Sequence, residues 1–202
     1  MSADSSVLAY AERALEYADA LGSIAAMAQE DRELIGRWAG EIDGPVLDVG
    51  CGPGHWTAWL HARGVDIVGL DPVREFVEIA LDRHQECDFR QGTVEALDVA
   101  SASLAGALAW YSLIHLEPPR IPGALMELAR CIRPGGGLLI GFFEGPVVAP
   151  FGHKVTTAYA WPVAEFARLL DDAGFLVEEV HVRTDTGHRP HGALVAVRAS
   201  GS

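Results

Sequence analysis

The sequence predicts a doubly wound α/β fold with a seven-stranded, mostly parallel sheet whose last strand is antiparallel, preceded by an N-terminal helical lid. Strand and helix patterns alternate from Pro45 onward, which is typical of a parallel sheet with helices on both faces. The last two strand patterns have no helix between them, so they are expected to form an antiparallel pair. The first strand runs into a glycine-rich loop, VLDVGCGPG, at residues 46–54, and ligand-binding α/β domains often place such a loop there.

Residues 1–44 are predicted to form the helical lid, and residues 45–202 the α/β domain. Ala, Glu, Arg and Leu dominate residues 4–40, where apolar residues recur at helical spacing. Gly22 and Ser23 are expected to divide this stretch into two helices. With 202 residues, of which 50% are hydrophobic, the chain can build one domain with a sizeable core.

Short apolar runs predict the strands, and amphipathic runs predict the helices. Gly64 and Gly174 follow two of the helices, and a glycine is common at that position. Residues 144–161 carry Gly, Pro and aromatic residues without clear periodicity, so we expect an irregular binding loop or lid there. The expected strands cover residues 46–50, 66–70, 87–91, 104–110, 138–143, 175–183 and 192–198, and the expected helices between them cover residues 55–63, 72–84, 121–132 and 162–173.

The charge balance argues against a nucleic-acid partner. The formal net charge is −13, from 28 acidic residues against 15 Lys and Arg, and such a field repels a phosphate backbone. The N-terminus has neither the basic start nor the apolar stretch of a signal peptide, and no window reaches the roughly 18 apolar residues that span a bilayer. We therefore expect a cytoplasmic protein with no membrane partner. Its oligomeric state is open, with a homodimer among the candidates.

The glycine-rich loop indicates a ligand with a nucleoside part. Gly50, Gly52 and Gly54 permit positive φ angles and the close approach of a ligand to the backbone. A loop that leads from a strand into a helix N-terminus also offers free N–H groups. Asp71 ends the next strand, 21 positions after Gly50, and an acid at this place can bind ribose hydroxyls.

The spacing of the glycines separates two classes of cofactor. Enzymes that bind nicotinamide dinucleotides favour G-x-G-x-x-G. This loop has the spacing G-x-G-x-G instead, and His55 stands where the third glycine of the dinucleotide pattern would be. A bulky histidine at that turn disfavours close approach of the helix to a pyrophosphate.

The loop and the segments after it resemble the class I S-adenosylmethionine-dependent methyltransferases, in particular their small-molecule members. The family's first motif, (V/L)-L-(D/E)-x-G-C-G-x-G, is matched by VLDVGCGPG, and its second by IVGLDPV with Asp71. Later segments are similar in order: FRQGTVEAL (89–97), LAWYSLIHLEP (108–118), LARCIRPGGGLLIGFF (128–143) and AEFARLLDDAGF (164–175). The resemblance covers about residues 45–198. It implies a Rossmann-like fold and methyl transfer from S-adenosylmethionine to a small-molecule acceptor, with S-adenosylhomocysteine as product.

The resemblance also implies which residues bind the cofactor. The backbone of the glycine loop would face the methionine part, and the acid of the second motif would bind the ribose. Residues after the second and third strands would surround the adenine, and residues at the end of the fourth strand would lie below the sulfonium, whose charge favours aromatic faces. The implied cofactor-binding residues are Gly50, Cys51, Gly52, Gly54, Asp71, Pro72, Val73, Thr93, Val94, Trp110, Tyr111 and Ser112.

The acceptor is expected to contact residues after the fourth and fifth strands and residues of the lid. Methyl transfer is a direct displacement that needs an aligned nucleophile and dry walls. His115 is the candidate general base, required only if the acceptor arrives protonated, and a structural role is its alternative. His188 and His191, in the last hairpin, are expected to be surface residues. The candidates for acceptor binding are Tyr17, His153 and Tyr159, followed by Trp161. Tyr10 and Tyr17 are also candidate aromatic faces for the sulfonium, and His153 and Glu144 are the next candidates for the base after His115.

Other reactive side chains are expected to be structural. Asp48, inside an apolar strand, would support the glycine loop, because an unpaired buried carboxylate is costly. Cys51, Cys87 and Cys131 are odd in number and lack metal-site spacing, so we expect reduced thiols and no metal site.

Two alternative functions remain open from the sequence. The first is a nicotinamide-dependent oxidoreductase, and the second is a non-catalytic binder of S-adenosylmethionine or S-adenosylhomocysteine. A nucleic-acid acceptor is less favoured, because WYSLIHLEPP after the fourth strand lacks the Asn/Asp-Pro-Pro-Tyr/Phe element of the family's DNA amino-methylating members.

Overall fold

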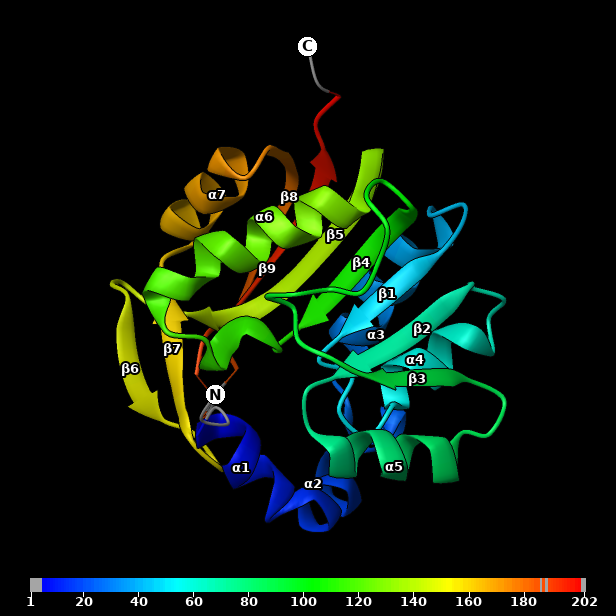
Figure 1. Ribbon diagram of the computed structural model, residues 1–202. Helices are drawn as coiled ribbons and strands as arrows, with labels where there is room; N and C mark the ends of the chain where they lie inside the picture. The colour runs from blue at the N-terminus through cyan, green and yellow to red at the C-terminus, as the bar shows by residue number, and fades with distance from the viewer. Residues whose placement is uncertain (1–4, 186, 188, 201–202) are drawn as a thin grey trace.

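The computed structural model describes residues 5–185, 187 and 189–200 and contains a mixed sheet flanked by helices (Figure 1). The strands are β1 (Val46–Val49), β2 (Ile67–Asp71), β3 (Asp88–Gln91), β4 (Leu104–Trp110), β5 (Ile132–Glu144), β6 (Ala149–Gly152), β7 (Thr157–Trp161), β8 (Phe175–Arg183) and β9 (His191–Arg198). The α-helices are α1 (Ser5–Ala11), α2 (Ala14–Leu21), α3 (Gln29–Gly40), α4 (His55–His61), α5 (Arg74–Arg83), α6 (Ile121–Cys131) and α7 (Val163–Asp172). Short 3-10 turns are η1 (Ile24–Ala26), η2 (Leu113–His115) and η3 (Pro118–Arg120).

The central strands run parallel in the order β3-β2-β1-β4-β5. Leu47 of β1 lies opposite Val68 of β2 on one side and Ala107 of β4 on the other. The last strand, β9, pairs antiparallel with both β5 and β8, as the helix-free end of the chain predicts. The strand order reverses between β1 and β4, and the carboxyl ends of strands at such a reversal form the usual ligand crevice.

Helices cover both faces of the sheet (Figure 1). Leu138, Ile140 and Phe142 of β5 join a core cluster with α6 and α7, whereas Leu139 joins a second cluster with α3 and α4. Successive side chains of a strand point to opposite faces, so a strand buried on both faces reads as one continuous apolar run. This is why β4 and β5 show no alternation in the sequence.

The long segment after β5 differs from the irregular loop that we expected. Residues 149–161 form an antiparallel hairpin of β6 and β7, in which Phe151 pairs with Ala158. The hairpin joins the sheet because Phe143 and Glu144, at the end of β5, pair with Ala160 and Trp161 of β7. Within the described residues the sheet therefore has nine strands rather than the predicted seven, although the fold class is as predicted.

The N-terminal residues divide into two parts. Helix α3 is part of the core, since Leu34, Ile35 and Trp38 are buried against β1, β4 and β9. Helices α1 and α2 instead contact α5 and form a small cluster in which Ala14 packs with Phe76. We predicted a lid over residues 1–44. Because α3 packs in the core, the lid stays a prediction for α1 and α2 only. No helix within the described ranges is long and apolar enough to cross a membrane.

Candidate functional site

A cavity of about 650 Å³ lies at the carboxyl ends of β1, β2 and β4. Its wall includes the glycine loop, the segments after β2, β3 and β4, and side chains of α1 and α2. A volume of this size is in the range of small-molecule and cofactor sites. The cavity is therefore located where the strand order predicts a ligand.

The glycine loop takes a conformation that only glycine adopts readily. Gly50, Gly52 and Gly54 have φ angles of 71°, 55° and 85°. A Cβ atom on Gly50 would lie 2.3 Å from the Cβ of Ser112, whereas one on Gly52 would meet no protein atom within 4 Å. Gly50 therefore permits the close approach of the loop to the end of β4, and Gly52 leaves space beside the cavity that it lines.

Asp71 ends β2 and is nearly fully buried in the cavity wall. Its Oδ2 accepts a hydrogen bond from the N–H of Gly52, and its Oδ1 accepts one from the N–H of Val73, each at 2.8 Å. Burial raises the pKa of this carboxyl to about 6, and the two backbone N–H groups act in the opposite direction. Each carboxylate oxygen can accept more than one hydrogen bond, so Asp71 can also receive two neighbouring hydroxyl groups of a ligand.

Asp48 connects β1 to α4 beneath the loop. Its Oδ2 accepts a hydrogen bond from the hydroxyl of Thr57 at 2.6 Å, and both side chains are buried. Burial raises the pKa of Asp48 to about 7, while the Thr57 hydroxyl favours the ionised form. This contact supports the predicted structural role for Asp48, and the carboxyl also lines the cavity.

Two polar atoms in the cavity wall lack a partner among the described residues. They are the buried Oγ of Ser112 and the buried Nδ1 of His55. Desolvation lowers the pKa of His55 to about 4, so the ring is neutral near pH 7. An unsatisfied buried polar group costs roughly 1–3 kcal/mol. A ligand with polar groups next to the glycine loop would remove this cost.

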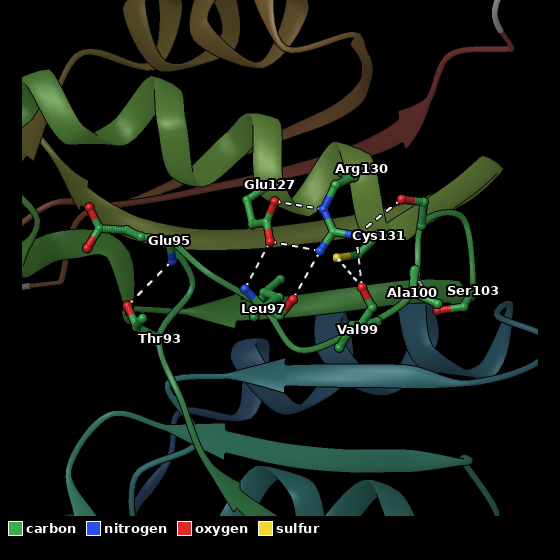
Figure 2. Close-up of polar contacts among 10 residues, drawn as sticks. Thr93, Glu95, Leu97, Val99, Ala100, Ser103, Glu127, Arg130 and Cys131 are labelled. Carbon is green, nitrogen blue, oxygen red and sulfur yellow. Dashed lines mark hydrogen bonds and ion pairs between the residues drawn. The ribbon is translucent and has the colours of Figure 1, made fainter.

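The segment between β3 and β4 brings Gly92, Thr93 and Val94 to the cavity. Figure 2 shows how the following residues are held against α6. Glu127 accepts a hydrogen bond from the N–H of Leu97, and the Arg130 guanidinium donates to the carbonyls of Leu97 and Val99. These contacts fix the path of an otherwise irregular segment.

Tyr111 follows β4 with a φ angle of 55°. A positive φ is unusual for a bulky residue and is often found at functional sites. The N–H of Tyr111 donates to the carbonyl of Gly141 at 3.0 Å, and its ring contacts Trp110 and Phe143. The backbone therefore turns the phenol out of the strand direction and into the cavity wall.

His191 is part of the cavity wall, so our expectation of a surface residue is wrong for it. It opens β9 and lies opposite Phe143 of β5, and its Nδ1 is hydrogen-bonded to the hydroxyl of Tyr111. The pairing of β9 with β5 moves this histidine from the apparent hairpin into the site. His188, the other histidine of that prediction, lies outside the described residues.

His115 joins three elements. Its Nδ1 lies 2.7 Å from the carbonyl oxygen of Thr157 in β7, and its Nε2 lies 2.9 Å from the hydroxyl of Tyr10 in α1. A carbonyl only accepts, so Nδ1 carries the proton in this arrangement and the Tyr10 hydroxyl donates to Nε2. Burial raises the pKa of Tyr10, which keeps that hydroxyl protonated.

His153 and a charged pair also line the cavity. Desolvation lowers the pKa of His153 to about 4, so the ring, which contacts Phe143 and His115, is neutral near pH 7. Arg120 and Glu95 both line the cavity and form a two-bond ion pair, one bond of which measures 2.8 Å from Nε to Oε1. The pairing compensates the charges of these two side chains.

Most of the predicted site residues meet in the cavity. Those that line it are Gly50, Cys51, Gly52, Asp71, Pro72, Val73, Thr93, Val94, Trp110, Tyr111, Ser112, Tyr10, Tyr17, His115 and His153. Gly54, Tyr159, Glu144 and Trp161 are not part of this wall; a Cβ on Gly54 would instead lie 2.7 Å from the Phe89 ring, so this glycine allows α4 to pack. Within the described ranges, no three His, Cys, Asp or Glu side chains are grouped as a metal site.

Several residues of the wall were not predicted as site residues. They include Asp31, His55, Arg120, Phe143 and His191. Of these residues, only His55 could have been found from the sequence, because it directly follows the glycine loop. We took it as an argument against a dinucleotide cofactor and did not predict that it contacts a ligand. The others reach the cavity through contacts between distant parts of the chain.

Comparison with known proteins agrees with this arrangement. A family model described as a methyltransferase domain matches residues 46–136. The biotin biosynthesis bifunctional protein BioHC of Cellvibrio japonicus is 35% identical over 117 residues, which are 57% of this chain and 22% of that protein. The demethylmenaquinone methyltransferase of Renibacterium salmoninarum is 31% identical over 129 residues, which are 63% of this chain and 53% of that protein. The chain thus spans about half the length of the second relative and much less of the first.

A solved structure shares the fold over nearly the whole chain. The 1,6-didemethyltoxoflavin-N1-methyltransferase of Burkholderia thailandensis superposes with a TM-score of 0.79 at 23% identity, over 96% of this chain and 88% of that one. The likeness extends over β8 and β9, beyond the part matched by the family model. The glycine loop with its acid at the end of β2, the methyltransferase domain matched at residues 46–136 and the shared fold all support a class I S-adenosylmethionine-dependent methyltransferase.

Proposed function

We propose that this protein transfers a methyl group from S-adenosylmethionine to a small-molecule acceptor by direct displacement, leaving S-adenosylhomocysteine. The main observation behind this proposal is the position of Asp71. Its carboxylate accepts a hydrogen bond from the N–H of Gly52, and both residues line the cavity. A carboxylate so placed can bind ribose hydroxyls while it holds the loop that faces the rest of the cofactor. Net charge of −13 supports a small acceptor over a nucleic acid.

The cofactor fits the polar atoms of the wall. The free Oγ of Ser112 and Nδ1 of His55 lie beside the glycine loop, where the amino and carboxylate groups of a methionine part would meet them. Thr93 and Val94 are suited to the adenine. When bound, the cofactor supplies an electrophilic methyl on a sulfonium, and the aromatic faces of Trp110 and Tyr111 favour such a cation.

We further propose that α1 and α2 act as a lid over the acceptor. Val7 and Tyr10 of α1 and Tyr17 of α2 line the cavity. No residue of α1 is fully buried, and a helix whose side chains are only partly buried opens at low cost. Closing it over the reactants would exclude water from the displacement.

His115 was the predicted general base. Its contacts with the Thr157 carbonyl and the Tyr10 hydroxyl favour a different role, in which it holds the lid. The variant His115→Ala distinguishes the two roles. A base would be needed for turnover of a protonated acceptor whatever the state of α1, whereas a lid contact would mainly raise KM.

Calorimetry with S-adenosylmethionine, S-adenosylhomocysteine and NADH tests the cofactor. We expect binding of the first two and no heat from the third. Metabolite mixtures incubated with protein and S-adenosylmethionine should then give S-adenosylhomocysteine and one product heavier by a methylene. Tight NADH binding without a response to S-adenosylmethionine would contradict the proposal, and cofactor binding without any methylated product would identify a non-catalytic binder.

A further inference from the structure

We infer that Tyr111 and His191 together accept the proton of a planar aromatic acceptor that reacts through a hydroxyl group. This inference rests on the proposed methyl transfer and adds an acceptor class and a catalytic pair to it. Tyr111 was expected only to lie below the cofactor, and His191 was expected at the surface.

Rings dominate the acceptor side of the cavity. Tyr10, Tyr111, Phe143, His115, His153 and His191 all line it. The rings contact one another at centroid distances of 5.0 Å for Tyr111 and Phe143 and 5.2 Å for Phe143 and His153. Aromatic side chains favour offset or edge contacts with a further ring, and His153 is neutral here, so the wall suits an uncharged planar molecule.

The hydrogen bond between Tyr111 and His191 can pass a proton from the phenol to the imidazole. Burial raises the pKa of the Tyr111 phenol, and the negative charge of Asp31 raises it further, so the phenol is protonated. In the histidine tautomer that carries its proton on Nε2, the phenol donates to Nδ1 of His191, and the proposed proton transfer uses this tautomer. In this state the phenol oxygen can accept a hydrogen bond from an acceptor hydroxyl while its proton is already directed at the imidazole.

The charges around the pair suit a transient imidazolium. A second cavity of about 410 Å³ lies against the first and shares Asp31, Trp110, Tyr111 and His191 with it. Asp31 of α3 is paired with Arg183 of β8 at 2.7 Å, and Arg183 also contacts Asp185. The second cavity is further lined by Glu30 and His181. The carboxylates on this side would stabilise a proton on His191 before it passes to solvent.

The proton balance of the step is complete. The acceptor oxygen forms a bond to the methyl carbon, the methyl–sulfur bond breaks, and its electron pair stays on sulfur. The acceptor O–H bond breaks as its proton moves to the Tyr111 oxygen, and the phenol proton moves to Nδ1 of His191. A hydroxyl is a weak nucleophile until it loses its proton, whereas a neutral amine attacks through its lone pair. A proton-accepting pair is therefore most useful to a hydroxyl acceptor.

Matched probes test the acceptor class. We would incubate the protein and S-adenosylmethionine with 2-naphthol and with decahydro-2-naphthol, its saturated analogue, and measure S-adenosylhomocysteine and the methyl ether. We expect transfer to 2-naphthol and none to the saturated alcohol. Equal transfer to both alcohols, or none to either while S-adenosylhomocysteine binds in calorimetry, would overturn the inference. A protein that binds neither S-adenosylmethionine nor S-adenosylhomocysteine would instead overturn the proposed function.

Variants test the pair. His191→Gln keeps a polar group but accepts no proton, so we expect kcat/KM for 2-naphthol to fall by about 10²-fold or more. With 1-nitro-2-naphthol, whose more acidic hydroxyl is ionised in the assay, the loss should largely disappear, which a merely structural role would not produce. Tyr111→Phe should show the same dependence on the acceptor. His61→Gln, at the exposed end of α4, is the matched control. An equal loss with both naphthols, or no loss with 2-naphthol, would contradict the role of His191.

Discussion

The hydroxyl of Tyr10 lies 2.9 Å from Nε2 of His115, and this contact joins α1 to the segment after β4 across 105 positions of the chain. Both side chains line the cavity, and the other ring nitrogen of His115 reaches β7. Helix α1, the turn after β4 and strand β7 are thus linked through one imidazole. A change at Tyr10 should therefore act on α1, whereas a change at His115 also removes the contact with β7.

For Tyr10→Phe, we expect faster hydrogen exchange over residues 5–11 and a loss of only about 0.5–1.5 kcal/mol in the free energy of unfolding, the usual value of one hydrogen bond. Tyr17→Phe is the matched control, because it keeps the ring contact with Phe76 and leaves the His115 contact in place. Mass spectrometry measures the hydrogen exchange. Unchanged exchange over residues 5–11 in Tyr10→Phe would mean that the hydrogen bond to His115 does not hold α1 in place.

Asp71→Ala should weaken S-adenosylmethionine binding. The variant loses the hydrogen bonds to the cofactor hydroxyls, each worth about 1.5–3 kcal/mol when one partner is charged, and it frees the N–H groups of Gly52 and Val73. Calorimetry gives the affinity, and Glu75→Gln, an exposed acid on α5, controls for the change in net charge. Unchanged affinity in Asp71→Ala would place the ribose elsewhere.

Alanine substitutions can separate two roles of the glycine loop, namely close packing at Gly50 and ligand space at Gly52. Gly50→Ala should destabilise the fold strongly, because its Cβ would overlap Ser112. Gly52→Ala should cost only the left-handed strain of roughly 1–2 kcal/mol but should weaken cofactor binding. Gly64→Ala is the control. Gly64 also has a positive φ angle, 86°, and a Cβ on it would meet no atom within 4 Å, but it follows α4 and does not line the cavity. Urea unfolding and calorimetry on the three variants give both quantities, and equal binding by Gly52→Ala and Gly64→Ala would contradict the assignment.

The buried carboxyls should make stability fall as the pH rises. Burial raises the pKa of Asp48 to about 7 and that of Asp71 to about 6, so between about pH 4 and pH 7 the folded chain binds more protons than the unfolded chain. Their contribution to stability is present at low pH and is lost as the pH passes through the folded values. Asp48→Asn cannot ionise and still accepts from Thr57. Its free energy of unfolding relative to the parent should therefore increase between about pH 5 and about pH 8. The same difference at both pH values would contradict this pKa.

The expected strands and helices were mostly confirmed because their signals are local. Val46–Val49, Leu104–Trp110 and Phe175–Arg183 are apolar or alternating runs bounded by turns, and such runs are readable without knowledge of their neighbours. The hairpin of residues 149–161 was missed because its strands have no periodic pattern of their own. They pair with each other and with the last two residues of β5, which the local sequence does not report.

The sequence by itself determined the fold class, the glycine loop and Asp71, because strand and helix periods and the spacing of a motif are properties of neighbouring residues. The tertiary structure decided which of the candidate side chains line the cavity and added others to them. Tyr111 meets His191 across 80 positions and Tyr10 meets His115 across 105, and such pairs arise only when strands and helices pack. The proposed donor loop is thus formed by consecutive residues, whereas the proposed acceptor pocket is assembled from the ends of β4, β5 and β9 and from α1.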